Sequence, residues 1–473
     1  MRVAVVGGGI AGLAAAWELR RDGAEVVVIE REPRLGGKIR TVRRDGFVFE
    51  AGADSFLETR PEPSGLCRDL GLDRELVRAR PGGAYVWARG ALRPLPHGTR
   101  LLPTRLIPLL ESGLLTPREK ARAALDLVLP GATSGEDESL GRLVERRMGR
   151  AVVDRIAAPL LAGIHAADPD RLSVAATFPA LREAERSHGS LLRGLRAGGG
   201  GNVARGETSV GRATFVTLAS GLDALVARII DGLVDGLGAV ELVTAAEVRA
   251  IAPTERGWRM TLAGGEPIES EGLVLAVPGR VAGPLLAPHA PRAAALLASI
   301  EWVSTAVVTL AYREADAPPL PGHGFVVARD QRARITGCTW VSAKWPGRAA
   351  PGHVLLRAYL GHALDPVDLG ADDAELTRLA RDDLVRAMGL AAEPVLVDVA
   401  RWPFSMPQLT VGHLGRMAEV ERDLGRLPRL AVAGAGYRGV GIGDAVAQGR
   451  LAARSLATGA EKGFLQPDEG SRF

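Results

Sequence analysis

The sequence opens with a glycine-rich turn set between a short apolar strand and a helix. The run Gly7-Gly8-Gly9-Ile10-Ala11-Gly12 follows the β-branched residues 3–6, and residues 11–22 are rich in helix formers. A second apolar run at 26–29 ends at Glu30. Strand, helix and strand within thirty residues predict the first β-α-β unit of a doubly wound, parallel α/β sheet, a Rossmann-like fold.

Each glycine of this turn has a role in binding a dinucleotide. Gly7 allows the tight turn, Gly9 lets the backbone approach a pyrophosphate, and Gly12 lets helix and strand pack closely. The helix N-terminus favours negative charge. Glu30 closes the second strand, where an acidic side chain is expected to bind ribose hydroxyls. The unit predicts a dinucleotide site that fits NAD and FAD equally well.

A second glycine pair follows the acidic residue at once, in Arg34-Leu35-Gly36-Gly37-Lys38. Paired glycines allow a close approach of the backbone to a ligand. Lys38 is one of only four lysines in the chain, and we expect it near a phosphate, with an ordinary surface position as the alternative.

After the β-α-β unit and the second glycine pair, the spacing of apolar residues along the chain changes twice. Residues 101–185 carry apolar side chains at helical spacing, with helices expected at 112–126, 139–148 and 152–161. Residues 197–212 are rich in glycine and polar side chains and predict a flexible loop. The middle of the chain therefore predicts a mostly helical block that ends at a loop.

Strand-like patterns dominate the second half. Segments between 301 and 360 predict an antiparallel sheet, with a covering helix at 372–388. The short apolar run at 430–434 and the glycine-rich stretch behind it predict a further buried strand and a last helix at 444–457. We expect the chain to return there to its first domain.

The glycine pair after the acidic residue resembles the flavoprotein superfamily of amine oxidases, phytoene desaturases and porphyrinogen oxidases, which favours FAD over NAD. Further stretches, in one order along the whole chain, resemble the oxygen-dependent protoporphyrinogen/coproporphyrinogen oxidase family, and most closely its Gram-positive-type coproporphyrinogen III oxidases. These stretches are Gly36–Thr41, Glu50–Leu57, Leu95–Gly98, Ala158–Asp168, Leu172–Pro179, Thr339–Trp340, Lys344–Pro346, Arg401–Trp402, Met406–Gln408 and Gly439–Ile442.

The resemblance implies a non-covalent FAD, with no metal and no catalytic side chain assigned. It places FAD contacts at Gly7, Gly8, Gly9, Ile10, Ala11, Gly12, Glu30, Arg31, Gly37, Lys38, Gly52, Ala53, Asp54, Ser55, Val248 (through its backbone), Trp402, Val440, Gly441 and Ile442. A tetracarboxylate substrate would need cations at the pocket mouth. The candidate substrate residues are Arg60, Arg80, Gly163, Ile164, Gly324 and Lys344.

The expected fold is α/β, with a discontinuous Rossmann-like FAD-binding domain, an α+β substrate domain and a mostly helical domain. We assign residues 1–75, 213–285 and 400–460 to the FAD-binding domain, residues 76–100 and 286–399 to the substrate domain, and residues 101–196 to the helical domain. The loop at 197–212 separates the helical domain from the return of the chain to the nucleotide fold.

The implied reaction is the oxidation of coproporphyrinogen III to coproporphyrin III in heme biosynthesis. Hydride passes from a meso carbon to flavin N5, and O2 reoxidises the flavin with release of H2O2. Protoporphyrinogen IX is the alternative substrate. A flavin amine oxidase and a flavin-bound scaffold or porphyrin-delivery protein without turnover are the alternative classes. Against the amine oxidase, Cys67 and Cys338 lie far along the chain from the segment 434–443.

The lengths of the apolar stretches and the number of cysteines indicate where the protein is located, and the implied reaction indicates its partners. No apolar stretch reaches the roughly 18 to 20 residues that cross a bilayer, and the chain begins directly with a strand rather than a secretory signal. With only two cysteines, we expect a cytoplasmic protein, with peripheral contact to the inner face of the cell membrane left open. The expected partners are a porphyrinogen, O2 and, for product hand-over, ferrochelatase, with no nucleic acid.

Overall fold

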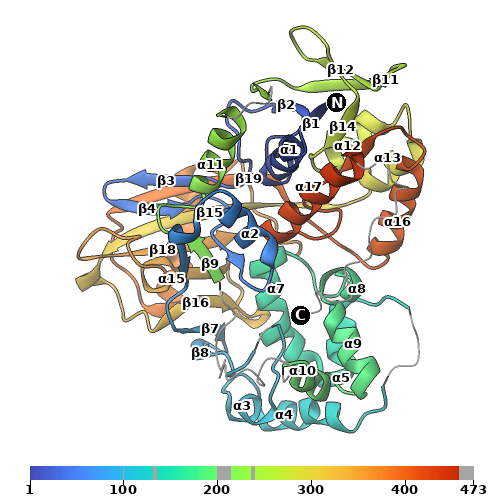
Figure 1. The fold of residues 1–473 in the computed structure, drawn as a ribbon. Helices are drawn as coiled ribbons and strands as arrows, with labels where there is room; N and C mark the ends of the chain where they lie inside the picture. The colour runs from blue at the N-terminus through green and yellow to red at the C-terminus, as the bar shows by residue number, and fades with distance from the viewer. Residues whose placement is uncertain (100, 132–135, 200–214, 236–239, 458–473) are drawn as a thin grey trace.

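A computed structural model describes residues 1–99, 101–131, 136–199, 215–235 and 240–457 (Figure 1). A parallel sheet lies at the top of this view, a larger sheet at the left, and a group of helices at the bottom. Within the described residues no helix is both long enough and apolar enough to span a membrane.

The first sheet is parallel throughout and confirms the predicted α/β fold. Its strand order is β10 (Val240–Val243), β2 (Glu25–Ile29), β1 (Arg2–Val6), β14 (Gly272–Leu275), β20 (Leu430–Val432). Apart from β10, whose residues are partly exposed, these strands are short and almost fully buried, because helices cover one face of the sheet and helices with a small sheet cover the other. The chain thus returns twice to the sheet that it began, and the apolar run at 430–434 is the buried strand that the sequence predicted.

Alternate side chains of β1 and β2 enter two different cores. One core contains the helices α1 (Ile10–Arg21), α2 (Pro61–Asp69), α11 (Asp223–Val234) and α17 (Ile442–Ala457). The other contains α12 (Gly279–Leu286), α13 (Pro291–Ala298), α16 (His413–Leu424) and the small sheet of β11 (Val248–Pro253), β12 (Trp258–Leu262) and β13 (Ile268–Ser270). α1 and α17 pack so closely that a Cβ on Gly449 would lie 2.1 Å from the carbonyl oxygen of Ala11.

The second sheet has seven strands. Their order is β19 (Leu396–Pro407), β15 (Trp302–Arg313), β18 (His353–Leu360), β17 (Ile335–Trp340), β16 (Gly322–Val327), β7 (Gly83–Ala88), β8 (Ala91–Pro94). The sheet is mixed rather than purely antiparallel, because β16 pairs with β7 in parallel. The helix α15 (Asp373–Met388) begins at its N-cap Asp372 and packs on this sheet, as predicted.

Two predicted domain boundaries do not coincide with the sheets. The boundary at residue 400 cuts through β19, which pairs with β15 along most of its length as the edge strand of the seven-stranded sheet. The boundary at 286 assigns α13 to the substrate domain, yet α13 packs against the core under the parallel sheet. Both differences have one cause: the partner of a strand or helix depends on distant residues, not on its own pattern. The division into three domains stays a prediction.

Two smaller sheets link these layers. One pairs β3 (Thr41–Arg44) with β4 (Phe47–Glu50), and the other has the order β5 (Phe56–Leu57), β9 (Phe215–Leu218), β6 (Leu76–Arg78). The strand β9 resumes the chain after the helical region and lies between two strands from the first eighty residues.

The helical region has the predicted character but different boundaries. Its helices are α3 (Leu106–Glu111), α4 (Pro117–Ala124), α5 (Leu140–Met148), α6 (Arg150–Val152), α7 (Ala158–His165), α8 (Val174–Thr177), α9 (Pro179–His188) and α10 (Leu191–Gly199). The helix expected at 112–126 begins only after Thr116, which forms a capping box with Glu119. The helix expected at 152–161 contains a π-helical turn at Val153–Ala157. α10 extends to Gly199, and the rest of the predicted loop lies outside the described residues.

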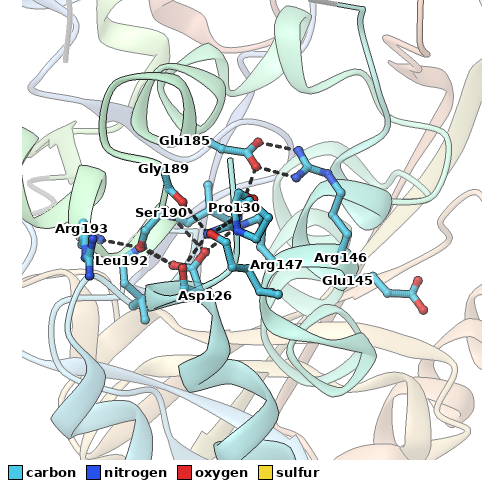
Figure 2. A network of polar contacts seen from close by, with 12 residues as sticks. Asp126, Pro130, Glu145, Arg146, Arg147, Glu185, Gly189, Ser190, Leu192 and Arg193 are labelled. Atoms are coloured by element: carbon cyan, nitrogen blue, oxygen red, sulfur yellow. Dashed lines mark hydrogen bonds and ion pairs between the residues drawn. The ribbon is translucent and has the colours of Figure 1, made fainter. Parts of the chain in front are cut away.

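A buried ion pair holds the helical region together (Figure 2). Arg147 of α5 binds the carboxylate of Asp126 at 2.7 Å, and both side chains are almost completely buried. The guanidinium also donates to the carbonyl oxygens of Pro130 and Gly189. Asp126 in turn accepts from Ser190 Oγ and from the first backbone amides of α10. One ion pair therefore links three segments of the region: residues 126–130, α5, and the junction of α9 and α10 at residues 189–192.

Candidate functional site

The first glycine turn has the geometry that its sequence predicts. Gly7 has a positive φ of 106°, and its amide donates to Ile29 O at 2.8 Å. A Cβ on Gly12 would lie 1.9 Å from Gly7 O, so only glycine allows this packing. Gly9 differs, because a Cβ there would meet nothing within 4 Å. The backbone at Gly9 therefore faces open space, in the position where a ligand phosphate is expected.

The N-terminus of α1 at this turn has no side-chain cap and no acidic residue in its first turn. The first amides of a helix have no partner within the helix and carry partial positive charge. With Gly9 open beside them, these amides can bind an anion. This uncapped helix end and the open glycine fit a dinucleotide pyrophosphate.

Glu30 lies at the carboxyl end of β2, and backbone amides orient its carboxylate. One oxygen accepts from Gly8 N at 2.7 Å and the other from Glu32 N at 2.9 Å. The backbone carbonyl oxygen of Glu30 also accepts a hydrogen bond from the amide of Ala246. This contact brings the start of β11, whose first residue is Val248, close to Glu30. The carboxylate keeps lone pairs for two hydroxyl groups. Arg31 points to solvent and pairs with Glu32.

The second glycine pair lies directly against the first turn. Gly36 N donates to Gly8 O at 2.8 Å, and Gly9 and Gly36 form a parallel bridge. A Cβ on Gly37 would lie 3.1 Å from the Cα atom of Gly9. Both glycine motifs therefore line the same opening.

Lys38 does not point toward this opening. Its ammonium donates to the carbonyl oxygen of Ser405 and lies 5.6 Å from the ring centroid of Trp302. Burial, and then the nearby Arg280, lower the pKa of Lys38 to about 8. In this structure Lys38 binds β19, and its contact with a ligand phosphate stays a prediction.

This lowered pKa predicts a pH-dependent stability. Folded Lys38 loses its proton near pH 8, whereas the unfolded chain keeps it up to about 10.5, the ordinary value for lysine. Between these values unfolding takes up a proton, so the free energy of unfolding rises with pH. We expect the flavin-free protein to gain stability relative to Lys38→Met from pH 7.5 to 9.5 in urea unfolding. Parallel pH profiles of the two proteins would contradict this.

The predicted flavin-binding turn Gly52–Ser55 lies beside the glycine motifs. Ala53 N donates to Lys38 O at 3.2 Å, and a Cβ on Gly52 would overlap that same oxygen. Trp402 of β19 donates through Nε1 to Ala51 O at 2.8 Å, and its ring lies against Gly52. The structure thus brings Trp402 to this turn from 350 residues away.

Behind the turn lies a buried cluster formed by Asp54, Lys344 and Arg357. Lys344 Nζ lies 3.6 Å and Arg357 Nη1 3.5 Å from Asp54 Oδ2. Arg357 also donates to Gly52 O at 2.7 Å. Burial opposes ionisation of Asp54, but Lys344 and Arg357 outweigh it and lower its pKa to about 2. The cluster therefore carries two positive charges and one negative charge.

Lys344 was predicted at the mouth of a substrate pocket, and the structure corrects this position. Only 7% of Lys344 is exposed, and its ammonium lies over the rings of Phe215 and Trp345. A side chain buried between an ion pair and two aromatic rings cannot meet a carboxylate arriving from solvent. The residue supports the turn from behind.

The C-terminal segment holds the last group of predicted flavin-binding residues. The amides of Val440 and Gly441 both donate to Asp444 Oδ2, and Ile442 begins α17. Arg60 is exposed and lies 3.6 Å from Asp444 Oδ1. Arg60 and the predicted residues Val440–Ile442 are therefore neighbours, although about 380 residues separate them.

The remaining candidates lie at different places. Gly163 and Ile164 are exposed on α7, and Ile164 is 49% exposed, which suits contact with an apolar ligand. Arg80 is exposed, and its backbone carbonyl binds His323. Gly324 is buried in β16, where a Cβ would lie 2.1 Å from Cys338 O. The requirement for glycine there comes from the neighbouring strand, not from a ligand.

The sequence reasoning missed Arg357 and Tyr359, which lie on one face of β18. The guanidinium of Arg357 lies 5.4 Å from the Tyr359 ring centroid, and the Tyr359 hydroxyl pairs with Thr339 Oγ1 at 2.8 Å. Burial raises the pKa of Tyr359 to about 12. An arginine in the middle of an otherwise apolar strand was the available signal, since such a charge needs a buried partner.

Comparison with known proteins agrees with this geometry. The chain matches the family described as flavin containing amine oxidoreductase over residues 10–457. It is 35% identical to coproporphyrinogen III oxidase of Bacillus subtilis, covering 96% of this chain and 98% of the relative. It is 36% identical to coproporphyrinogen III oxidase of Propionibacterium freudenreichii, covering 95% and 89%.

A solved structure extends this agreement to the fold. It is a provisionally assigned protoporphyrinogen oxidase of Exiguobacterium sp. 255-15, with 31% identity, a TM-score of 0.85, and coverage of 97% of this chain and 99% of that one. The predicted resemblance and the predicted flavin cofactor are confirmed. The chain belongs to the flavin containing amine oxidoreductase family, in the group that holds these porphyrinogen oxidases.

Proposed function

We propose that this protein oxidises coproporphyrinogen III to coproporphyrin III with a non-covalently bound FAD and O2, releasing H2O2. The choice of substrate rests on one observation: the chain is 35% identical to a coproporphyrinogen III oxidase across nearly the full length of both chains. The reaction removes six electrons and six protons, so three two-electron rounds use three molecules of O2.

The described residues offer a binding site for each part of FAD: the pyrophosphate, the ribose and the ring system. The uncapped α1 and the open Gly9 suit the pyrophosphate, and Glu30 suits the ribose hydroxyls. The turn Gly52–Ser55 and the segment Val440–Ile442 suit the two sides of the ring system. When bound, FAD supplies a two-electron acceptor that O2 can reoxidise. The chain contributes binding, orientation and electrostatics.

The charge of the cluster behind the turn gives it an electrostatic role. With two cations and one carboxylate, Asp54, Lys344 and Arg357 leave one net positive charge next to the predicted flavin-binding turn. A buried positive charge stabilises negative charge that develops nearby, because little water screens it. We propose that the cluster favours reduction of the cofactor.

Lys344→Met should therefore lower the midpoint potential of the bound FAD, by roughly 30 mV or more. The variant removes the net positive charge but keeps the ion pair of Asp54 with Arg357. Spectroelectrochemical titration of the holoprotein measures the potential. Lys120→Met, on α4 of the helical region, controls for the loss of a lysine elsewhere. An unchanged or higher potential in Lys344→Met would remove the proposed role.

The substrate is proposed to lie between the flavin-binding turn and α7. Gly163 and Ile164 offer an apolar contact on α7, while Arg60 and Arg80 are exposed cations for its carboxylates. Arg60 has a weak partner in Asp444 at 3.6 Å and can exchange it for a substrate carboxylate.

Oxygen consumption by the holoprotein, side by side with coproporphyrinogen III and protoporphyrinogen IX, tests the function. We expect faster turnover of coproporphyrinogen III, with peroxide formed for each O2 consumed. Faster turnover of protoporphyrinogen IX overturns the substrate. Peroxide released on adding primary or secondary amines, with neither porphyrinogen oxidised, indicates an amine oxidase. Bound FAD that no porphyrinogen reduces without oxygen indicates a delivery protein.

We further propose that the helical region touches the inner face of the cell membrane. Apolar side chains on α3 and after α4 are exposed there, with Ile107 67% and Val128 75% accessible. Co-sedimentation with anionic lipid vesicles tests this, and the variant Ile107→Glu/Val128→Glu should stay in the supernatant.

We also propose a transient hand-over to ferrochelatase, because the reaction product is a metal-free porphyrin. Native gels of the two proteins mixed with product test that contact.

A further inference from the structure

A cavity of about 450 Å³ opens between α7, the turn that joins β16 to β17, and the loop after β18. Its floor is apolar and includes Ala158, Ala162 and Ile335. The polar groups around it come from Arg329, Arg332, Arg334, Thr336, His362 and Asp365. No predicted flavin or substrate residue lines it. On α7, Ala158 and Ala162 line the cavity, whereas Ile164 lies about 120° from Ala158 and about 160° from Ala162 around the helix, at 100° per residue. The cavity is therefore separate from the candidate flavin site.

The arginines of this cavity differ in their partners. Arg329 binds Asp168 at 2.9 Å and Asp170 at 3.3 Å, so its charge is neutralised. Arg334 likewise binds Asp365 at 2.7 Å. Across the part of the chain that the structure describes, no carboxylate pairs with the side chain of Arg332. One cation at the cavity wall is thus left for a ligand.

His362 supplies a neutral donor at the same cavity. Leu364 N donates to its Nδ1 at 3.3 Å, which places the ring proton on Nε2. Burial is the main cause that lowers the pKa of His362, with Asp365, Arg329, Asp168 and Arg334 around it. The imidazole is therefore neutral near pH 7 and offers an N–H group without adding charge.

The turn that carries Arg332 is held rigidly. Its backbone has a φ of 45°, the left-handed conformation that is unfavourable for a residue other than glycine. Two residues of α15 fix this turn: Arg386 donates to Gln331 O at 2.9 Å, and Asp383 accepts from the amides of Arg334 and Ile335. A cation on a preorganised turn loses little entropy on binding an anion.

We propose that this cavity binds an apolar organic molecule that carries a single anionic group. The apolar floor contacts the body of the ligand. Arg332 and His362 Nε2 donate hydrogen bonds to its carboxylate or sulfonate group. One unpaired cation and one neutral donor match one anionic group, not several. This site does not depend on the proposed reaction, because it shares no residue with the flavin site.

The test uses two probes of the same shape and different charge, on the holoprotein. 1-Anilinonaphthalene-8-sulfonate is anionic and N-phenyl-1-naphthylamine is neutral, and both fluoresce in apolar sites. Arg332→Gln should weaken the saturable binding of the anionic probe by roughly tenfold or more, and leave the neutral probe unchanged. Ala162→Trp, which fills the floor, should abolish this component for both probes. Arg313→Gln, an exposed arginine at the end of β15, serves as the matched control.

Two results would overturn the proposal. In the first, Arg332→Gln leaves the affinity for the anionic probe within twofold of the native protein, or weakens both probes equally. In the second, Ala162→Trp retains the saturable component. Circular dichroism and the flavin absorbance of each variant show that the fold and the cofactor are kept, and Arg332→Lys should recover part of the affinity because it restores the charge.

Discussion

The substitution Gly9→Ala should remove FAD binding without disturbing the fold. The backbone of Gly9 is extended, at φ −74° and ψ 175°, which any residue adopts, and its missing side chain faces open space. The flavin-free variant should therefore keep the native free energy of unfolding within about 0.5 kcal/mol. The added methyl group would occupy the space into which the pyrophosphate must come, and we expect a loss of roughly a hundredfold in affinity for FAD.

Gly12→Ala should behave in the opposite way. Its new Cβ would lie 1.9 Å from Gly7 O and 3.2 Å from the Cβ atom of Ala276, so α1 must move away from the sheet. We expect a cost of about 3 kcal/mol or more in unfolding free energy, even without cofactor. Gly264→Ala, in the β12–β13 turn where the added Cβ meets nothing, should change neither quantity.

Urea unfolding of the flavin-free proteins and flavin fluorescence titration separate the two effects. Equal loss of stability in Gly9→Ala and Gly12→Ala would show that both glycines serve packing alone. Native FAD affinity in Gly9→Ala would place the pyrophosphate elsewhere, and the proposed cofactor path would then be wrong.

The second large effect is expected in the helical region, at the buried pair shown in Figure 2. Arg147→Met leaves the carboxylate of Asp126 buried without its cation, and leaves carbonyl oxygens of Pro130 and Gly189 without a donor. Breaking a buried ion pair from one side costs about 3 to 5 kcal/mol. We expect a loss of this size in the free energy of unfolding.

A double variant distinguishes the ion pair from simple packing. Asp126→Asn in the Arg147→Met background removes the stranded charge, so the double variant should be more stable than Arg147→Met alone. Arg378→Met removes an arginine whose partners Glu375 and Asp382 are exposed, and should change stability little. A loss below about 1 kcal/mol in Arg147→Met, or a double variant less stable than the single one, would contradict the explanation.

The nucleotide-binding half of the site could be predicted because its chemistry is local. Gly7–Gly12, Glu30 and Gly36–Gly37 lie within 31 consecutive residues, and their spacing alone defines a turn, a helix end and an acidic strand end. The structure places all three around one opening. Lys38 belongs to the same segment, yet its direction depends on Ser405 in β19 and could not be inferred from its neighbours.

The other half of the site depends on contacts between distant residues. Asp54, Lys344 and Arg357 meet only because β18 and the residues after β17 pack behind the turn, and the sequence placed Lys344 at a pocket mouth instead. Trp402 reaches Ala51 because β19 pairs with β15, and this pairing extends across the predicted boundary at 400. Local periodicity predicts strands but does not choose their partners.

The sequence by itself determined the parallel α/β fold, the dinucleotide turn and the family to which the chain belongs. These features rest on short-range geometry, in which a glycine, a strand end and a helix end have to follow one another closely. Tertiary structure alone decided which charges are buried together and where Lys38 points. It also decided that Arg332 lines a cavity with an apolar floor and has no carboxylate partner among the described residues. The reason is physical: the burial and pairing of a charge depend on every segment packed around it, and those segments come from far along the chain.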